Sequence, residues 1–337
     1  MRAIIPERYG RRRALRSPTV RALVVSNMRP DAAHPERGRF VRDQVAALRR
    51  LDGLSVGLYE FPPGARALAR APFDLRSRYR GERFDVVHAH FGLTAWPALA
   101  VRARGRALTV HGTDVTHPRT RLITRAALPT VGLLAAVSEA LVAQIPGRRA
   151  RERARVLPCG VDMERFKPIP RAQARAELGL DPSQPYVLFA ADPARAEKRH
   201  DRARALARAV GVQLLALGGV QPERVPLYVN AANAVLVPSE REGFGLAVLE
   251  ALACDVPVLA TPVGVHPQAL DTLRGAGGLP GTLCAPFELQ RWKTALASHV
   301  SELDPRVDGR ARAERFSSLR MAELLAEAWR SLIASAR

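Results

Sequence analysis

Short apolar runs alternate along the chain with segments of helical periodicity. Runs of four to six mostly apolar or β-branched residues, bounded by polar or turn residues, predict buried strands. In the N-terminal half these runs are 22–26, 54–58, 85–89 and 107–110, and in the C-terminal half 186–190, 212–217, 234–237 and 256–260. Strands that are apolar on both faces, with helices between them, predict parallel sheets covered on both sides. We therefore expect two α/β units in tandem, each a doubly wound parallel sheet.

Two helices and a domain join follow from the same pattern. Residues 40–51 are apolar at positions that share one helix face. Residues 317–336 also have an apolar face, which we expect to pack against the protein rather than bind a membrane. Proline-rich segments at 167–170 and 181–185 break regular structure. We predict an N-terminal domain over 1–165, a C-terminal domain over 166–318, and a final helix, 319–337, that packs back toward the N-terminal domain.

Composition places the chain among globular proteins. Its 337 residues are 47% hydrophobic and 25% charged, and we find no apolar stretch long enough for a transmembrane helix. The N-terminus lacks the continuous apolar region of a secretory signal. Cys159, Cys254 and Cys284 are far apart and form no CxxC pair, which argues against a disulfide framework or a zinc site. We expect a cytoplasmic protein.

The positive charge is concentrated in one half of the chain. Residues 1–160 hold 30 arginines against 12 acidic residues, a balance of +18, whereas residues 161–337 have a balance of +2. Such a half suggests an anionic partner, namely membrane lipid, a phosphorylated acceptor or nucleic acid, although a solvated arginine-rich surface explains it equally well. No zinc-finger spacing, RNP-type strand or helix-turn-helix pattern accompanies the charge, so we expect no specific nucleic acid.

The segment 234–250 is the most informative part of the chain. An apolar strand, 234–237, is followed by a Gly-Phe-Gly turn at 243–245 and then by the helical run 246–249. This order directs free backbone N–H groups and a helix N-terminus at an anion. Glu242 and Glu250 flank the turn, and a carboxylate there can hold a neighbouring hydroxyl. A phosphate beside sugar hydroxyls describes a nucleotide-sugar.

These residues resemble a known family. Glu242 and Glu250, with the glycine turn between them, resemble the E-x7-E signature of the family-4 retaining glycosyltransferases (glycosyl transferases group 1), which have the GT-B fold. The resemblance covers nearly the whole chain, and further matching segments are 85–90, 108–114, 155–168 and 228–233. It implies two tandem Rossmann-like domains that face a central cleft.

The resemblance also implies roles for individual residues. Glu250 would accept hydrogen bonds from the nucleotide ribose, while Glu242 and the 243–246 turn (Gly243, Phe244, Gly245 and Leu246) would contact the donor sugar and diphosphate. In the N-terminal domain Gly38 would approach a phosphate, His111 would contact the donor sugar, and Asp114 and Arg39 would lie on the acceptor side. The alternatives are ordinary structural roles: Glu250 pairing with an arginine, Glu242 as a turn carboxylate, Gly38 as a helix cap, and His111 as a core or loop-capping residue.

The charge of the leaving diphosphate must be neutralised by a metal or by fixed cations. The chain contains no Asp-x-Asp and no spacing typical of metal ligands, so we expect no metal and no cofactor. Arg195 and Lys198 resemble the family's arginine and lysine, although Asp192 stands where many members have that arginine. Arg199 or Arg202 are alternatives, as is a cluster of ordinary helix-surface cations.

The expected function is that of a retaining, metal-independent glycosyltransferase, with His111, Arg195, Lys198 and Glu242 as candidate catalytic residues. A nucleoside-diphosphate sugar would be the donor, and the acceptor a membrane-linked or anionic glycan or lipid in polysaccharide, cell-wall or glycolipid synthesis. We expect partial association with the anionic inner face of the membrane. The alternatives are a GT-B scaffold without catalysis, a basic nucleic-acid-binding protein, and an epimerase or phosphorylase on the same fold.

Overall fold

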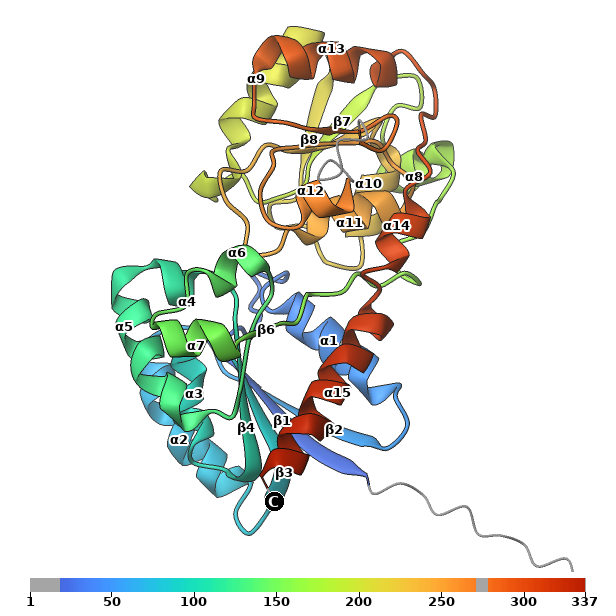
Figure 1. Ribbon diagram of the computed structural model, residues 1–337. Coiled ribbons are helices and arrows are strands. Elements are labelled where there is room, and N and C mark those ends of the chain that lie inside the picture. The colour runs from blue at the N-terminus through green and yellow to red at the C-terminus, as the bar shows by residue number, and fades with distance from the viewer. Residues whose placement is uncertain (1–18, 271–277, 337) are drawn as a thin grey trace, which may run out of the picture.

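The computed structural model describes residues 19–270 and 278–336. Figure 1 shows two α/β domains, one above the other, each built on a parallel sheet. The N-terminal sheet has six strands in the order β2-β1-β3-β4-β5-β6, and the C-terminal sheet has five in the order β11-β10-β9-β7-β8. The predicted fold class is confirmed. The basic residues of 1–18, and the prediction that this segment is no secretory signal, lie outside the described residues.

All eight predicted strands are present, and β5, β6 and β11 are additional to them. The strands of the N-terminal sheet are β1 (Val20–Ser26), β2 (Leu54–Glu60), β3 (Arg83–His90), β4 (Arg102–Val110), β5 (Leu133–Ala136) and β6 (Arg155–Val156). Those of the C-terminal sheet are β7 (Tyr186–Phe189), β8 (Gln213–Ala216), β9 (Ala234–Val237), β10 (Val258–Ala260) and β11 (Leu283–Cys284). Central strands such as β7 and β9 are buried at every position because helices cover both faces of the sheet.

Helices pack on both faces of each sheet. Those of the N-terminal domain are α1 (Arg39–Arg49), α2 (Ala65–Arg78), α3 (Ala95–Ala98), α4 (Thr113–Thr116), α5 (Pro118–Ala127), α6 (Glu139–Val142) and α7 (Arg148–Arg153), with the 3-10 turns η1 (Gly92–Thr94) and η2 (Leu128–Thr130). Those of the C-terminal domain are α8 (Arg171–Leu178), α9 (His200–Val210), α10 (Val225–Ala231), α11 (Leu246–Ala253), α12 (His266–Ala269), α13 (Leu289–Val300) and α14 (Arg310–Glu314), with the 3-10 turn η3 (Ala196–Lys198). The last helix is α15 (Ser318–Ser335).

The chain crosses between the domains twice, and the two crossings are hydrogen-bonded to each other. The Val161 N–H donates to the Phe316 carbonyl at 2.9 Å, and the Ser318 N–H donates to the Val161 carbonyl at 2.8 Å. Gly160 permits this approach, since a Cβ there would lie 2.4 Å from the Cα of Ser318. The second crossing leads into α15, which returns to the N-terminal domain and lies along α1 and β4 (Figure 1).

The apolar face of α15 completes the N-terminal core. Trp329 and Leu325 are buried with residues of α1 and of strands β1 and β3. Gly105 and Gly132 make room for Leu332, because a Cβ at either position would lie within 2.8 Å of that side chain. The N-terminal domain therefore depends on the last segment of the chain for part of its core.

Truncation of Trp329 tests this dependence. The indole is fully buried, and its Nε1–H donates to His88 Nδ1 at 3.2 Å. We expect Trp329→Ala to lower the free energy of unfolding by about 3–5 kcal/mol. Leu324→Ala on the same helix is the control, because Leu324 is 41% exposed and its loss should cost about 0.5 kcal/mol or less. If urea titrations gave the two variants an equal loss in the free energy of unfolding, α15 would dock without a specific core contact.

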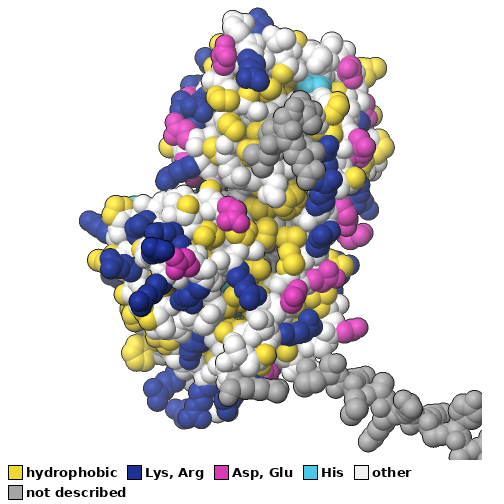
Figure 2. All heavy atoms as spheres, viewed as in Figure 1, with side chains coloured by type: hydrophobic (Ala, Val, Ile, Leu, Met, Phe, Trp, Pro, Cys, Tyr) yellow, Lys and Arg dark blue, Asp and Glu magenta, His cyan; other side chains and the backbone are white. Residues whose placement is uncertain are grey.

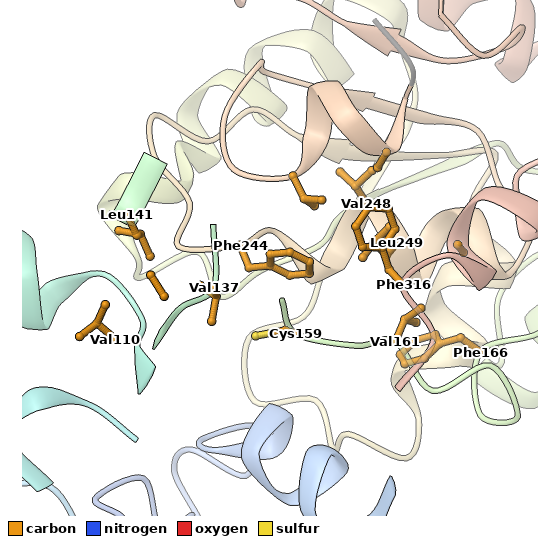
Figure 3. Packing of buried hydrophobic residues seen from close by; sticks show 14 of the residues in the cluster. Val110, Val137, Leu141, Cys159, Val161, Phe166, Phe244, Val248, Leu249 and Phe316 are labelled. Carbon is orange, nitrogen blue, oxygen red and sulfur yellow. The ribbon is translucent and has the colours of Figure 1, made fainter. Parts of the chain in front are cut away.

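A continuous apolar cluster joins the two domains. Figure 3 shows Phe244 of the C-terminal domain lying between Val137 of the N-terminal domain and Phe316. The rings of Phe244 and Phe316 are 6.2 Å apart. Phe244 is 7% exposed, so the turn that carries it is anchored between the domains rather than free in solvent.

Candidate active site

A large cavity lies between the two domains, at the carboxyl ends of the parallel strands. Its volume is about 590 Å³. Each sheet changes winding direction beside it, between β1 and β3 in one domain and between β7 and β9 in the other. Open parallel sheets bind ligands at such switch points. The predicted site residues that line this cavity are His111, Asp114, Arg195, Lys198, Glu242, Gly243, Phe244, Gly245 and Leu246.

The glycine turn before α11 supplies unpaired backbone donors. Among the described residues, the N–H groups of 243–246 donate to no partner. Gly245 has φ of 102°, and a Cβ there would lie 2.4 Å from His266 Nε2. A Cβ on Gly243 would lie 2.2 Å from the carbonyl oxygen of His111, in the opposite domain. The two glycines thus allow the turn to fold tightly, to touch the N-terminal domain and to leave its amides free for an anion.

Lys198 and Glu242 form a buried ion pair at this turn. Lys198 Nζ lies 2.7 and 2.6 Å from the two carboxylate oxygens of Glu242, and the Ser239 hydroxyl donates to Oε1 at 2.8 Å. Burial alone would raise the pKa of Glu242, but the Lys198 ammonium and these hydrogen bonds hold it below its ordinary value. Glu242 is therefore ionised, and it holds Lys198 at the cavity wall.

The other predicted cations have different positions. Arg195 lines the cavity, where it pairs with Glu197 at 2.7 Å and is 57% exposed. Arg199 pairs with Asp201 and Glu240, and Arg202 donates to the Pro238 carbonyl; neither lines the cavity. Asp192 accepts a hydrogen bond from the N–H of Ala194 in the loop after β7. Of these three arginines, Arg195 alone lines the cavity, three residues beyond Asp192.

His111 is the end of a stack of buried histidines. Its ring lies 5.1 Å from that of His90, which lies 4.8 Å from that of His88. Burial lowers the pKa of His111 well below its ordinary value and that of His90 to about 3, so both rings are neutral.

The hydrogen bonds of His90 assign the tautomer of His111. His90 Nδ1 and His111 Nε2 are 2.9 Å apart, and His90 Nε2 is buried without a partner among the described residues. A buried acceptor left unpaired costs less than a buried N–H donor, because a lone pair tolerates weak contacts. His90 therefore carries its proton on Nδ1 and donates it to His111 Nε2, which places the remaining proton of His111 on Nδ1.

Asp114 supports the loop that carries His111. Its buried carboxylate accepts hydrogen bonds from the N–H groups of Gly112 at 2.8 Å, His111 at 3.1 Å and Gly92 at 3.3 Å. Burial raises the pKa of this carboxyl, against the lowering effect of these backbone donors. Asp114 lines the cavity, yet its oxygens are directed at the backbone of its own domain.

Gly38 and Arg39 do not line the cavity. Gly38 precedes α1 with φ of 67°, and a Cβ there would lie 2.3 Å from the Met28 carbonyl oxygen. The chain's own backbone therefore explains that glycine. Arg39 pairs with Asp43 at 2.9 Å and with Glu223 of the C-terminal domain at 2.6 Å, so it links the domains.

Glu250 lies one turn into α11, outside the cavity lining. Arg165 comes near it, but Arg165 donates both Nη groups to Asp43, at 3.0 and 2.8 Å. Within the described residues no donor pairs with the Glu250 carboxylate, which is the reverse of a helix carboxylate satisfied by an arginine. Burial raises its pKa to about 7. Its oxygens thus accept no hydrogen bond from the described residues.

Glu250→Gln should stabilise the ligand-free protein at high pH and weaken nucleotide binding. The pKa of Glu250 is about 7 in the fold against an ordinary 4.5. Between these values the folded state keeps a proton that the unfolded state has lost, so stability falls as pH rises and the full penalty is present above pH 7. The variant should gain about 1–3 kcal/mol over wild type at pH 8 and little at pH 4.5. Thermal unfolding across this range measures the difference, and a gap independent of pH would contradict the assignment.

Several cavity residues were missing from the sequence-based prediction. They come from the loops after β1, β3 and β4, from α1 and α6, and from the turn after β9, and they include Met28, Phe40, Phe91, Leu141, Gln144 and Arg241. Phe91 and Phe40 contact the His111 ring at centroid distances of 4.7 and 4.9 Å. The available signal was their place directly after predicted parallel strands, which identifies the loops but not the side chains.

Two family models match successive halves of the chain. Residues 12–165 match Glycosyltransferase Family 4, and residues 178–313 match Glycosyl transferases group 1. The chain belongs to glycosyltransferase family 4. The two matched ranges include the glycine turn of the C-terminal domain and the His111 loop of the N-terminal domain.

Curated relatives and solved structures agree with this assignment. The D-inositol 3-phosphate glycosyltransferase of Segniliparus rotundus is 28% identical over 74% of this chain and 67% of its own length. The D-inositol 3-phosphate glycosyltransferase of Mycobacterium avium is 28% identical over 82% of this chain and 74% of its own length. Sucrose-phosphate synthase from Thermosynechococcus elongatus shares the GT-B fold, with a TM-score of 0.69 at 19% identity over 94% of this chain and all of that one. Anabaena HepE, solved in complex with UDP-glucose, has a TM-score of 0.65 at 18% identity over 93% and 100%.

Within residues 19–270 and 278–336, no group of three or more His, Cys, Asp or Glu side chains is placed to hold a metal ion. In the same residues, each helix is too short or too polar to cross a bilayer.

Proposed function

We propose that this glycosyltransferase moves a sugar from a nucleoside-diphosphate sugar to a hydroxyl of its acceptor, with retention of anomeric configuration. The observation that carries the proposal is the meeting of unpaired amides at 243–246 with Lys198 and Arg195 in one cavity. Amides at a helix N-terminus and two cations suit a diphosphate. Solved relatives of the same fold hold UDP-glucose, or ADP with acarbose.

Fixed cations would neutralise the leaving diphosphate in place of a metal. Lys198 is already held at the cavity wall by Glu242, so its charge needs no reorganisation when the donor binds. Arg195 is more exposed and can turn from Glu197 to a phosphate oxygen. The deduced Nδ1–H of His111 would donate to a hydroxyl of the transferred sugar.

The positions of the carboxylates support retention without a protein nucleophile. In the described lining, Glu242 is held by both oxygens against Lys198, Asp114 is held by three backbone N–H groups, and Glu197 pairs with Arg195. Each acid of this lining thus already has a partner before a donor binds. The departing diphosphate, on the face where the new bond forms, is then the base that takes the proton of the acceptor hydroxyl.

A thermal-shift screen with UDP-, GDP- and ADP-sugars tests the donor site. At least one of them should raise Tm, and Glu250→Ala should reduce that shift. The outcome against the proposal is no shift with any donor, or an equal shift for the variant. A shift without any turnover, across a panel of acceptors, would favour the GT-B scaffold.

We further propose that the enzyme works at the cytoplasmic membrane surface on a membrane-linked acceptor. Helices α2, α3 and α5 expose apolar side chains, and Trp96 Nε1 on α3 donates to the Ile123 carbonyl on α5. The exposed apolar residues there are Phe73, Trp96, Leu99, Leu122 and Ile123. Exposed arginines on α2 and α5 accompany them, namely Arg66, Arg70, Arg76, Arg78, Arg119 and Arg125, with Asp74 as the exposed acid of these helices. Figure 2 shows dark blue and yellow side chains mixed on this side of the N-terminal domain.

Flotation with liposomes measures this association. We expect binding to vesicles that contain anionic lipid, with loss at high salt. Leu122→Ser/Ile123→Ser should weaken it, whereas Leu303→Ser, an exposed leucine of the C-terminal domain, should not. Binding indifferent to lipid charge and salt would remove the membrane proposal and leave the donor site untouched.

A further inference from the structure

We infer that the acceptor bears no charge where it enters the cavity, and that it is a hydroxylated molecule with an apolar portion. This inference rests on the proposed function and names the substrate class of the same site. It differs from an anionic acceptor, which the +18 balance of the N-terminal half suggests.

The acceptor wall of the cavity is apolar and uncharged apart from Asp114. Among the described residues, the side chains that the N-terminal half contributes include neither lysine nor arginine. The apolar contributors are Met28, Phe40, Phe91, Leu93, Val137, Leu141 and Cys159, and the neutral polar ones are Asn27, His111, Thr113, Thr116, Thr120 and Gln144. Hydroxyl and amide groups among aromatic and aliphatic surface suit a sugar or polyol joined to an apolar group.

Four described arginines of that half are engaged in other contacts. Arg121 does not line the cavity, and its guanidinium donates to the carbonyls of Val115 at 3.1 Å and Gln144 at 2.8 Å. Arg37 pairs with Asp31, and Arg42 pairs with Glu60. Arg39 is in the ion pairs that link the domains. None of these four arginines is among the described residues that line the cavity.

The charges within the cavity are balanced before any ligand binds. The described lining has three cations, Arg195, Lys198 and Arg241, all from the C-terminal domain, and three acids, Glu197, Glu242 and Asp114. A donor diphosphate adds negative charge and occupies the cations on its side. An acceptor phosphate would then face the diphosphate with no cation on its own wall, and such like-charge contacts oppose binding.

Matched acceptor pairs test the inference by calorimetry, in the presence of the nucleoside diphosphate that the donor screen selects. The pairs are n-hexyl β-glucoside against glucose 1-phosphate, and myo-inositol against inositol 1-phosphate. We expect a neutral member to bind about tenfold tighter than its phosphorylated partner, with a gap that narrows as salt is raised. A phosphorylated member that binds as well as its neutral partner overturns the inference, and so does the absence of binding by both neutral compounds.

A change of charge on the acceptor wall gives a second readout. Gln144 lines the cavity and is exposed, so Gln144→Arg should bring binding of glucose 1-phosphate or inositol 1-phosphate up to that of the neutral partner. Gln173→Arg, on an exposed position of α8 outside the cavity, is the matched control and should leave the preference unchanged. An equal effect of both variants would show that overall charge sets the preference. Loss of the nucleotide-sugar shift itself would instead refute the proposed function.

Discussion

Lys198→Ala should lower kcat/KM for sugar transfer by roughly 100- to 1000-fold, the cost typical of removing one fixed group that stabilises transition-state charge. Lys198 is 15% exposed and held against both oxygens of Glu242. Its charge is therefore already in place when the diphosphate begins to leave. Release of nucleoside diphosphate in a coupled assay measures the loss.

A stability effect must be separated from this catalytic effect. Without Lys198, the buried Glu242 loses its cation, which raises its pKa and destabilises the fold. Lys198→Ala/Glu242→Gln should recover much of the lost Tm without recovering the rate. Lys293→Ala, at an exposed position on α13, is the matched control and should leave both unchanged. A loss of less than threefold in kcat/KM for Lys198→Ala would mean that another cation neutralises the charge of the diphosphate.

Gly243→Ala should reduce kcat by about 100-fold by forcing the domains apart. A Cβ at this position would lie 2.2 Å from the carbonyl oxygen of His111, so two backbones of opposite domains would have to separate. A displacement of about 1 Å between the reacting groups is enough for a loss of this size. Steady-state kinetics measures the rate, and small-angle scattering should show a larger radius of gyration.

Ser138→Ala provides the comparison for this prediction. The Ser138 hydroxyl donates to the Gly243 carbonyl at 3.1 Å, so its removal deletes an interdomain hydrogen bond without adding bulk. We expect Ser138→Ala to lower kcat by only a few fold. If Gly243→Ala behaved like Ser138→Ala, close approach of the domains would not be required for transfer.

Local pattern was sufficient for much of this molecule. Apolar runs predicted the eight strands because a buried parallel strand must be apolar on both faces. The Gly-Phe-Gly turn after 234–237 predicted a helix N-terminus with free amides, since positive φ and close packing select glycine. The apolar face of 317–336 predicted a helix that packs. Strand β6, with two residues, was too short to give any periodic signal.

Contacts between distant residues could not be predicted in this way. Lys198 and Glu242 are 44 positions apart, and their roles looked separate until the fold placed them in one ion pair. Arg39 suggested an acceptor contact, but its partners are Asp43 and Glu223. His90 contacts His111, 21 positions later in the chain, with 2.9 Å between His90 Nδ1 and His111 Nε2.

By itself, the sequence determined the two α/β units, the family, and the glycine turn with its free amides, because each depends on residue types within a few positions of one another. Only the tertiary structure decided which charged residues line the cavity. The described arginines of the N-terminal half lie outside the cavity lining, while the described cations that line it come from the nearly neutral half. Net charge is a sum over all residues of a segment. The cavity, in contrast, is lined by the few residues that the two sheets bring together at their facing edges, and only the folded chain brings them together.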